Sequence, residues 1–158
     1  MKLKHTKFQV ALEILGMLLM IGMIVFVYIR LNQLPRQIPG RYNALGEVDT
    51  LVSKNNIIIL PIVSTLLFTF LTIVTFLPKT WGLPVKITDL NREAIYCCTR
   101  SLLIFIKIEF LGIFFYLTYN MTATQPLPAE FTPIILFIII ETAIYFIIRM
   151  CKIGKQMV

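Results

Sequence analysis

Four long apolar runs decide what this chain can fold into. Each is close to the 20 or so residues that a helix rising about 1.5 Å per residue needs to cross the apolar part of a bilayer. Hydrophobic residues make up 58% of the chain, whereas a soluble domain contains about 45–50%. The sequence therefore predicts an all-α integral membrane protein with a single membrane domain over residues 1–158. Its four predicted transmembrane helices cover residues 8–29, 56–77, 94–119 and 131–148.

The first apolar run is expected to remain in the mature protein. It follows a short basic head and ends in Tyr28-Ile29-Arg30. A signal peptide also begins with basic residues, but its apolar core has only about 7–15 residues and ends at a small-residue cleavage site. The run over residues 8–29 is longer and has no such site. We therefore interpret it as a first transmembrane helix.

Charges in the loops predict how the helices are oriented. The two chain ends and the loop between the second and third runs carry nine Lys and Arg residues near the predicted spans, and the other side carries four. Because cytoplasmic loops are enriched in Lys and Arg, both termini are predicted to be cytoplasmic. The first loop, residues 30–55, is then extracytoplasmic, in a multi-pass protein of the plasma (cell) membrane.

The sequence carries no catalytic or metal-binding signature. His5 is its only histidine, and Cys97, Cys98 and Cys151 have neither CxxC nor metal-ligand spacing. Paired catalytic carboxylates, HExxH and Ser/Lys arrangements are also missing. The net charge of +7 comes from cations that flank the apolar runs, which favours anionic lipid over nucleic acid as a partner. We expect no enzymatic activity, no cofactor and no metal ion.

The only long polar passage, LPRQIPGRYNALGEVDTLVSK, lies between the first two runs. Its prolines, Pro35 and Pro39, each fix φ and push the preceding residue toward extended geometry, which predicts a stiff, polyproline-like arm. Residues 43–46 predict a tight turn, because Asn and Gly tolerate positive φ. Glu47 and Asp49 follow on a segment that could form a short strand. The passage is therefore expected to form a small shaped surface on the membrane.

Three interpretations of this surface are open. It can be a structural clip that ties the first two helices together, or a recognition surface for an extracellular peptide, a lipid headgroup or a partner protein. A third reading has Asn43, Glu47 and Asp49 holding a hard cation, although three oxygens fall short of the usual 6–8 ligands. The candidate binding residues are Pro35, Pro39, Arg41, Asn43, Gly46, Glu47 and Asp49.

The same passage resembles the signature loop of a known family. That loop reads Leu-Pro-x-x-Ile-Pro-x-His-Phe-Asn-x-x-Gly-x-x-Asp-x-x-x-x-Lys just after a first span. The matching residues here are Pro35, Ile38, Pro39, Asn43, Gly46, Asp49 and Lys54. Arg41 and Tyr42 stand where His-Phe is usual, so the resemblance carries over no histidine ligand.

The chain thus resembles the N-terminal module, a domain of unknown function, of the SdpI-like family of bacterial integral membrane proteins. This family includes the immunity proteins against the sporulation-delaying toxin. Those immunity proteins are longer and have additional spans, so the resemblance covers only their first part. It implies a bacterial, non-enzymatic role of the immunity or sensing type.

Three charged residues, Arg100, Lys107 and Glu109, fall inside the third apolar run. A charge at the bilayer centre costs about 2.5–3.5 kcal/mol on insertion scales. These side chains are therefore expected to face other helices, a wet cavity or the interface. Glu109 lies two residues from Lys107 and points about 200° away from it around the helix, so the two cannot pair well within the helix.

Partners for these charges must come from other helices. Lys107 and Glu141 are each predicted about 10–12 Å from the cytoplasmic side, which favours a Lys107–Glu141 pair. Glu13 enters from the same side and is the candidate partner of Arg100. Glu109 has no assigned partner, so it is either protonated or facing water or another subunit.

These charges allow several interpretations. They can form a structural ion pair that fixes helix packing, or line a polar cavity open to the cytoplasm and used for ligand binding or proton-coupled movement. Arg100 and Lys107 can also snorkel to the interface with no internal role. Contacts between two copies of the chain would satisfy the same charges.

Three functions follow from these features. The first is a non-enzymatic immunity or sensing protein that binds a toxin peptide or envelope ligand at the outer loop and holds a cytoplasmic regulator at its basic inner face. The second is a small transporter, or an accessory subunit of a membrane complex, that uses the intramembrane charges. The third, ranked last, is an intramembrane enzyme. The expected partners are the lipid bilayer, an extracellular peptide or lipid, and a regulator or a second copy of the chain, with no nucleic acid.

Overall fold

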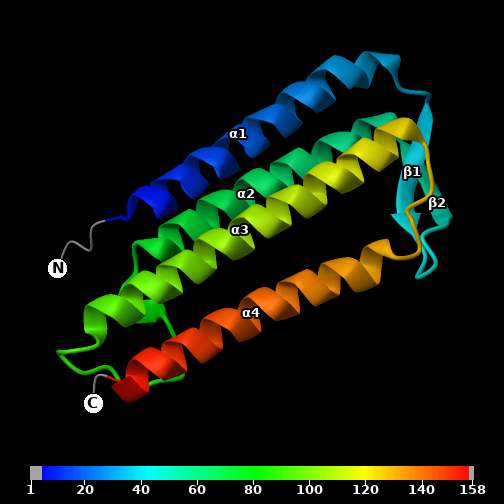
Figure 1. Cartoon of the computed structure of the whole chain (residues 1–158). Coiled ribbons are helices and arrows are strands. Elements are labelled where there is room, and N and C mark those ends of the chain that lie inside the picture. Colours follow the sequence, from blue (N-terminus) through cyan, green and yellow to red (C-terminus); the bar gives the residue numbers. More distant parts are fainter. Residues whose placement is uncertain (1–4, 157–158) are drawn as a thin grey trace.

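The computed structural model describes residues 5–156, so Lys2 and Lys4 of the basic head lie outside it. Long helices dominate the described chain and lie side by side (Figure 1). Each is long and apolar enough to cross a membrane, which confirms the predicted all-α membrane architecture. The four long helices are α1 (Lys7–Arg30), α2 (Ile59–Thr75), α3 (Arg92–Ala123) and α4 (Phe131–Gln156).

The helices begin and end for local reasons. A capping box starts α1, because the Thr6 hydroxyl accepts the Gln9 N–H while the Gln9 side chain accepts the Thr6 N–H. Helix α3 continues past the apolar run and ends where Thr124 adopts left-handed geometry with φ 52°. Short 3-10 turns η1 (Leu31–Gln33), η2 (Lys54–Ile58) and η3 (Pro78–Thr80) complete the connections.

The first loop folds into an antiparallel hairpin of β1 (Gln37–Tyr42) and β2 (Val48–Ser53). The turn predicted at residues 43–46 is confirmed, with Gly46 at φ 82°. The polyproline-like arm is wrong from Gln37 onward, because the backbone there pairs with β2 in the register Ile38↔Val52. Pairing is irregular just after Pro39, a residue without an N–H to donate.

The hairpin covers one end of the bundle, and both ends of the described chain lie at the other (Figure 1). We call these the hairpin end and the terminal end. A chain that crosses a membrane an even number of times has both of its ends on the same side, as these four helices do. The cytoplasmic placement of the terminal end stays a prediction of the loop charges.

Helix α3 is the centre of the fold, since it packs against each of the other three long helices. An apolar cluster joins the hairpin to the helices beneath it through Val27, Ile38, Ile57 and Met121, among others. Elsewhere the apolar side chains point outward. Only 6% of the apolar window of α4 is buried inside the protein. Lipid must therefore cover most of this helix, as expected for a membrane span.

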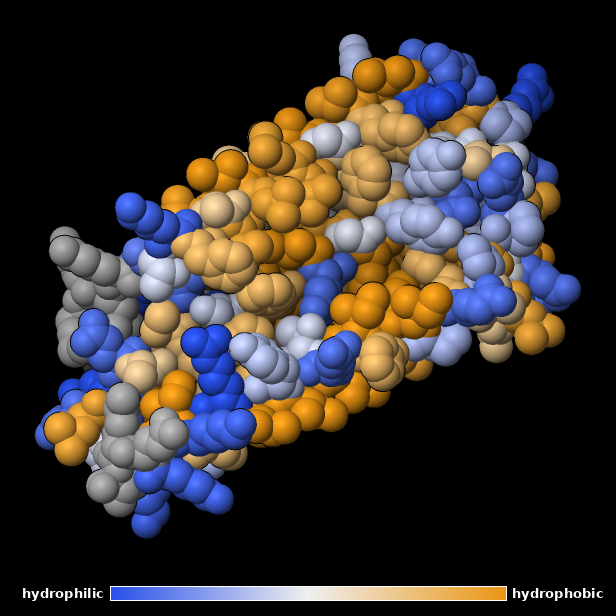
Figure 2. All heavy atoms as spheres, in the orientation of Figure 1, coloured by the Kyte–Doolittle hydropathy of each residue, from blue (hydrophilic) through white to orange (hydrophobic). Residues whose placement is uncertain are grey.

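The surface has the layering of a membrane protein. Figure 2 shows an apolar band around the middle of the molecule and hydrophilic side chains gathered at both ends. Within the band, a group of hydrophilic side chains is visible over the line between α3 and α4 (Figure 2). Two cavities lie along this line.

The hairpin turn gives a first testable prediction. A Cβ added at Gly46 would lie 2.1 Å from the Leu127 carbonyl oxygen, at a φ of +82° that L-residues rarely adopt. Gly46→Ala should therefore lower the free energy of unfolding by about 1–3 kcal/mol, the usual range for strained backbone. Thermal unfolding in detergent measures this. Gly82→Ala is the control, because a Cβ there meets nothing within 4 Å; an equal effect of both changes would contradict the prediction.

Candidate functional site

The side chain of Asn43 organises the hairpin turn. Its Oδ1 accepts the N–H groups of Leu45 at 2.9 Å and Glu47 at 3.0 Å. Its Nδ2 donates to Glu47 Oε2 at 2.9 Å. Asn43 and Glu47 thus bond to one another and to the backbone, which weakens the reading that they hold a cation. Their polar atoms shape the turn that carries them.

The turn is also attached to the linker between α3 and α4. The Gly46 carbonyl accepts the N–H of buried Leu127 at 2.8 Å. Two of the candidate binding residues, Pro39 and Gly46, are buried, so their role is in the folding of the hairpin. The structure places the other candidate binding residues at the surface: Pro35, Arg41, Asn43, Glu47 and Asp49.

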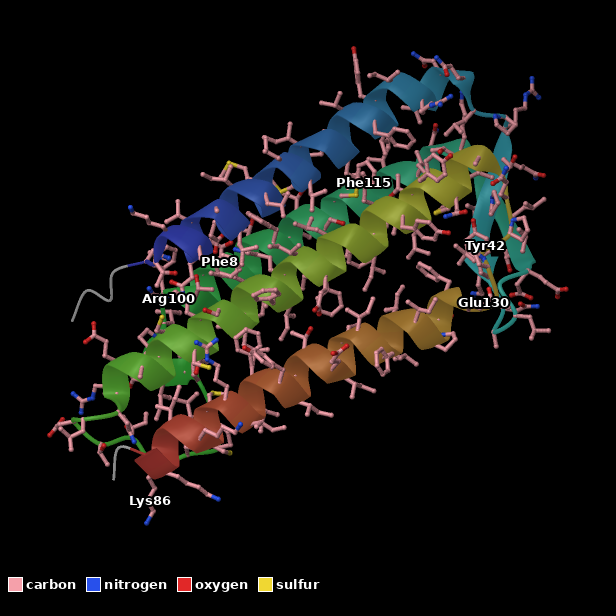
Figure 3. All side chains as sticks on the ribbon, in the orientation of Figure 1. Phe8, Tyr42, Lys86, Arg100, Phe115 and Glu130 are labelled. Atoms are coloured by element: carbon pink, nitrogen blue, oxygen red, sulfur yellow. The ribbon has the colours of Figure 1, made fainter. Side chains whose placement is uncertain are left out.

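A cavity of about 300 Å³, the hairpin pocket, opens beside β1. The Tyr42 hydroxyl is buried, and it has no hydrogen-bond partner among residues 5–156. Burial raises the pKa of Tyr42 to about 12. Figure 3 shows Tyr42 at the hairpin end, together with Glu130 at the start of α4. The pocket is lined by residues 40–43 of the hairpin and by Leu60, Leu117, Met121, Leu127, Phe131 and Thr132.

The second candidate region is a polar cluster inside the bundle, centred on Lys107. Its side chain is 0% exposed. The Lys107 ammonium donates to Glu13 Oε2 at 2.5 Å and to Thr72 Oγ1 at 3.0 Å. It also lies 4.5 Å from the centroid of the Phe68 ring. One cation therefore links α1, α2 and α3.

This cluster corrects one pairing predicted from the sequence. Lys107 bonds to Glu13 and not to Glu141. Glu13, the candidate partner of Arg100, thus bonds Lys107. The depth argument was sound for Lys107 and Glu141, but depth does not fix the rotation of α3. Lys107 faces α1 and α2, so Glu141 on α4 is behind it. Arg100 is buried in α3 near the terminal end (Figure 3).

Glu109 faces the opposite way, as its position around the helix predicts. Its Oε1 accepts the Thr142 hydroxyl of α4 at 2.5 Å. Its Oε2 is buried and has no hydrogen-bond partner in the described part of the chain. A mainly apolar cavity of about 260 Å³, the seam pocket, begins at this carboxyl and runs between α3 and α4 toward the hairpin end. Its lining includes Gly112, Tyr116 and Phe131.

A larger cavity of about 460 Å³, the terminal cavity, lies between the start of α1, α3 and α4. Glu141 and Arg149 both line it. Thr142, which bonds Glu109, lines it too, so the Glu109–Thr142 bond separates the terminal cavity from the seam pocket. The remaining lining residues are Thr6, Phe8, Cys97, Ser101, Phe105, Tyr145 and Phe146.

The sequence reasoning missed Gln9, which is 1% exposed. Its Nε2 donates to the Cys97 carbonyl at 3.1 Å and to Ser101 Oγ at 2.9 Å, which ties α1 to α3. The Thr6-x-x-Gln9 capping box was the available signal. Thr72 and Thr142 were also missed, because a hydroxyl within a span can equally bond its own helix.

Comparison with known proteins found one matching family model. Residues 18–65 match a family model described as Domain of unknown function (DUF1648). The matched segment covers the second half of α1, the hairpin and the start of α2, so it includes the whole signature loop. The comparisons with curated proteins and with solved structures found no match.

The fold is that of a multi-pass membrane protein, and residues 18–65 are similar to an uncharacterised domain typical of membrane proteins.

The Lys107 cluster predicts a strongly non-additive mutant cycle. Glu13→Gln leaves a fully buried ammonium without its anion, which should lower the free energy of unfolding by about 3–5 kcal/mol. Glu13→Gln combined with Lys107→Met removes both charges, so it should lose less than Glu13→Gln alone. Unfolding by sodium dodecyl sulfate in mixed micelles measures both. Glu130→Gln, at an exposed carboxylate, is the control; additive losses would contradict the buried pair.

Tyr42 predicts a pH dependence. With a pKa of about 12 in the folded state against about 10 in the unfolded state, its neutral form is favoured by folding. This contribution is fully present below pH 10 and is lost as the pH rises through 12. Tyr42→Phe should leave the melting temperature at pH 8 unchanged or higher, since it removes an unpaired buried hydroxyl.

The same variant should melt higher than the wild type at pH 11, where thermal unfolding is compared again. Tyr28→Phe is the matched control, because Tyr28 is 79% exposed and its loss should change neither value. A wild-type alkaline decrease that Tyr42→Phe leaves intact would contradict the assignment to Tyr42.

Proposed function

We propose that this chain is a non-enzymatic membrane protein of the immunity or sensing type, which binds a peptide at the extracytoplasmic face of its hairpin. One observation carries the proposal: the hairpin is anchored through β1 and presented through β2. Ile38 of β1 is fully buried in the cluster beneath the hairpin, whereas five of the six residues of β2 are exposed. The outward-facing side chains of β2 are therefore available to contact a ligand.

The exposed strand has the features of a peptide-binding edge. In a two-stranded sheet, β2 has one edge paired with β1 and one edge free. An extended peptide can add to such an edge through main-chain hydrogen bonds, with side chains supplying specificity. Large apolar side chains border this edge, since Leu45 is 66% exposed and Leu51 is 55% exposed. Arg41, Glu47 and Asp49 add charges around them.

A membrane-active peptide fits this position. It would reach the hairpin while lying on the bilayer surface, before it inserts. The resemblance of the loop to the SdpI-like family supports the same ligand class, and the DUF1648 match covers the segment concerned. The basic terminal end would then face the cytoplasm of a bacterial cell and could hold a regulator.

The second candidate, a small transporter or an accessory subunit of one, is favoured by the terminal cavity with Glu141 in its wall. In that case Glu141→Gln would abolish transport while the folded protein still accumulates in the membrane. An intramembrane enzyme has no feature in its favour among the described residues.

A growth assay tests the proposal. Bacteria sensitive to the sporulation-delaying toxin are given the wild type, Leu51→Glu or an empty vector, and the lowest inhibitory toxin concentration is measured. The wild type should raise this concentration, and Leu51→Glu should lose most of the protection, because a new charge disrupts the apolar border of the edge. Leu90→Glu is the matched control, since Leu90 is 79% exposed outside the hairpin.

Membrane levels of each variant are checked by immunoblotting. Equal protection by Leu51→Glu and the wild type would overturn binding at β2. No protection by the wild type against this toxin would remove the immunity reading.

A further inference from the structure

We propose that the terminal cavity is a binding site for an amphipathic organic cation, with Glu141 as the counter-charge. This inference concerns the end of the molecule away from the hairpin and does not depend on the proposed function. It rests on three properties of the cavity: a continuous aromatic wall, a carboxylate without a partner among the described residues, and a volume that suits a small molecule.

Four aromatic side chains form one side of the cavity. Neighbouring rings are in contact along the whole series: Phe8 and Phe105 have centroids 6.2 Å apart, Phe105 and Phe146 5.5 Å, and Phe146 and Tyr145 5.2 Å. Figure 3 places Phe8 toward the terminal end. The rings come from α1, α3 and α4, so the fold must assemble to make the wall. Aromatic faces attract organic cations through their quadrupole, most strongly when water is excluded.

Glu141 supplies the charge. Its side chain lines the cavity and makes no hydrogen bond or ion pair with any residue from 5 to 156. Arg149 also lines the cavity, but it lies eight residues further along α4, about 12 Å toward the terminal end. The deeper part of the cavity is therefore acidic. An unpaired carboxylate within a membrane span is costly, and a bound cation would offset that cost.

The size and surroundings of the cavity narrow the ligand class. A volume of about 460 Å³ is within the usual range of roughly 300–1,000 Å³ for small-molecule sites. The hydroxyls of Thr6, Ser101 and Thr142 bond within the protein, and each keeps a lone pair that can accept a hydrogen bond from a ligand. A compact cation with aromatic or branched apolar substituents would fill this space and could enter from the bilayer beside α4, which lipid covers along most of its length.

A second copy of the chain fits the cavity less well. Two copies in one membrane place equal depths opposite each other. Glu141 would then face charges at its own depth on the partner, including the other Glu141. Lys107 of the second copy could not be the counter-charge for Glu141, because its side chain is fully buried against Glu13. The charge pattern therefore favours a separate cation over a copy of this protein.

Tetraphenylphosphonium is a suitable probe, since it is an aromatic cation that enters bilayers. Binding to the full chain in lipid nanodiscs is measured by equilibrium dialysis, with protein-free nanodiscs subtracted. We expect saturable binding with one site per chain. Glu141→Gln should weaken it by about tenfold or more, as for loss of a desolvated charge partner. Glu130→Gln, an equal change of charge on an exposed residue before α4, should leave it unchanged.

Two further measurements distinguish specific binding from the effects of misfolding and of non-specific uptake into the bilayer. Tyr145→Leu keeps the charge and removes one ring of the wall, so it should weaken binding several-fold while the protein still elutes as a single species. Triphenylphosphine oxide, a neutral aromatic compound, should show no saturable binding.

Equal affinity of Glu141→Gln and the wild type, or saturable binding of the neutral compound, would overturn the proposal. A dimer that crosslinks through the α4 face and binds no probe would assign the cavity to a second copy instead.

Discussion

The buried contact between Lys107 and Glu13 is the interaction on which the rest of this structure depends. Lipid is as apolar as the helix surfaces, so apolar side chains alone give the spans little reason to associate. A fully buried ammonium, in contrast, requires an anion and further hydrogen-bond partners. Glu13 and Thr72 meet that need from two other helices, and Gln9 bonds α3 one turn nearer the terminal end. Helices α1, α2 and α3 are therefore fixed to one another by polar bonds.

Helix α4 is held differently, and both intramembrane cavities between it and α3 follow from this. In the middle of the span it bonds α3 through Thr142 and Glu109, with the ring contact of Phe105 and Phe146 nearby. Closer to the terminal end, weaker contacts that involve sulfur join Thr99 to Met150 and Cys98 to the Phe146 carbonyl. On either side of this bond the two helices leave space, which forms the seam pocket and the terminal cavity. The hairpin closes the far end through the bond of Gly46 to Leu127. The structure thus combines three helices joined by buried polar bonds with a fourth helix that borders the two cavities.

The sequence predicts the features that depend only on the order and spacing of residues along the chain. Bilayer thickness sets the length of the apolar runs, so all four spans were predictable, and the need for positive φ identified the turn at Gly46. The rotation of each helix about its axis cannot be read in this way. For that reason the sequence predicts a Lys107–Glu141 pair where the structure has Lys107–Glu13. Arg100 and Lys107 are seven residues apart, which predicts that they share a helix face but not which helix covers that face. The cavity around Glu141 depends on rings from three helices, so it could be found only in the folded chain.

Solid-state NMR of the protein in lipid bilayers tests the central contact most directly. The chain is labelled with ¹⁵N at lysine Nζ and ¹³C at glutamate Cδ, and dipolar recoupling detects the pairs in contact. Among the described residues, one lysine–glutamate contact is expected, because Lys107 and Glu13 form the sole Lys–Glu salt bridge there. The signal should disappear in Glu13→Gln and persist in Glu141→Gln. A signal that persists in Glu13→Gln and disappears in Glu141→Gln would place Lys107 against α4 and contradict this account.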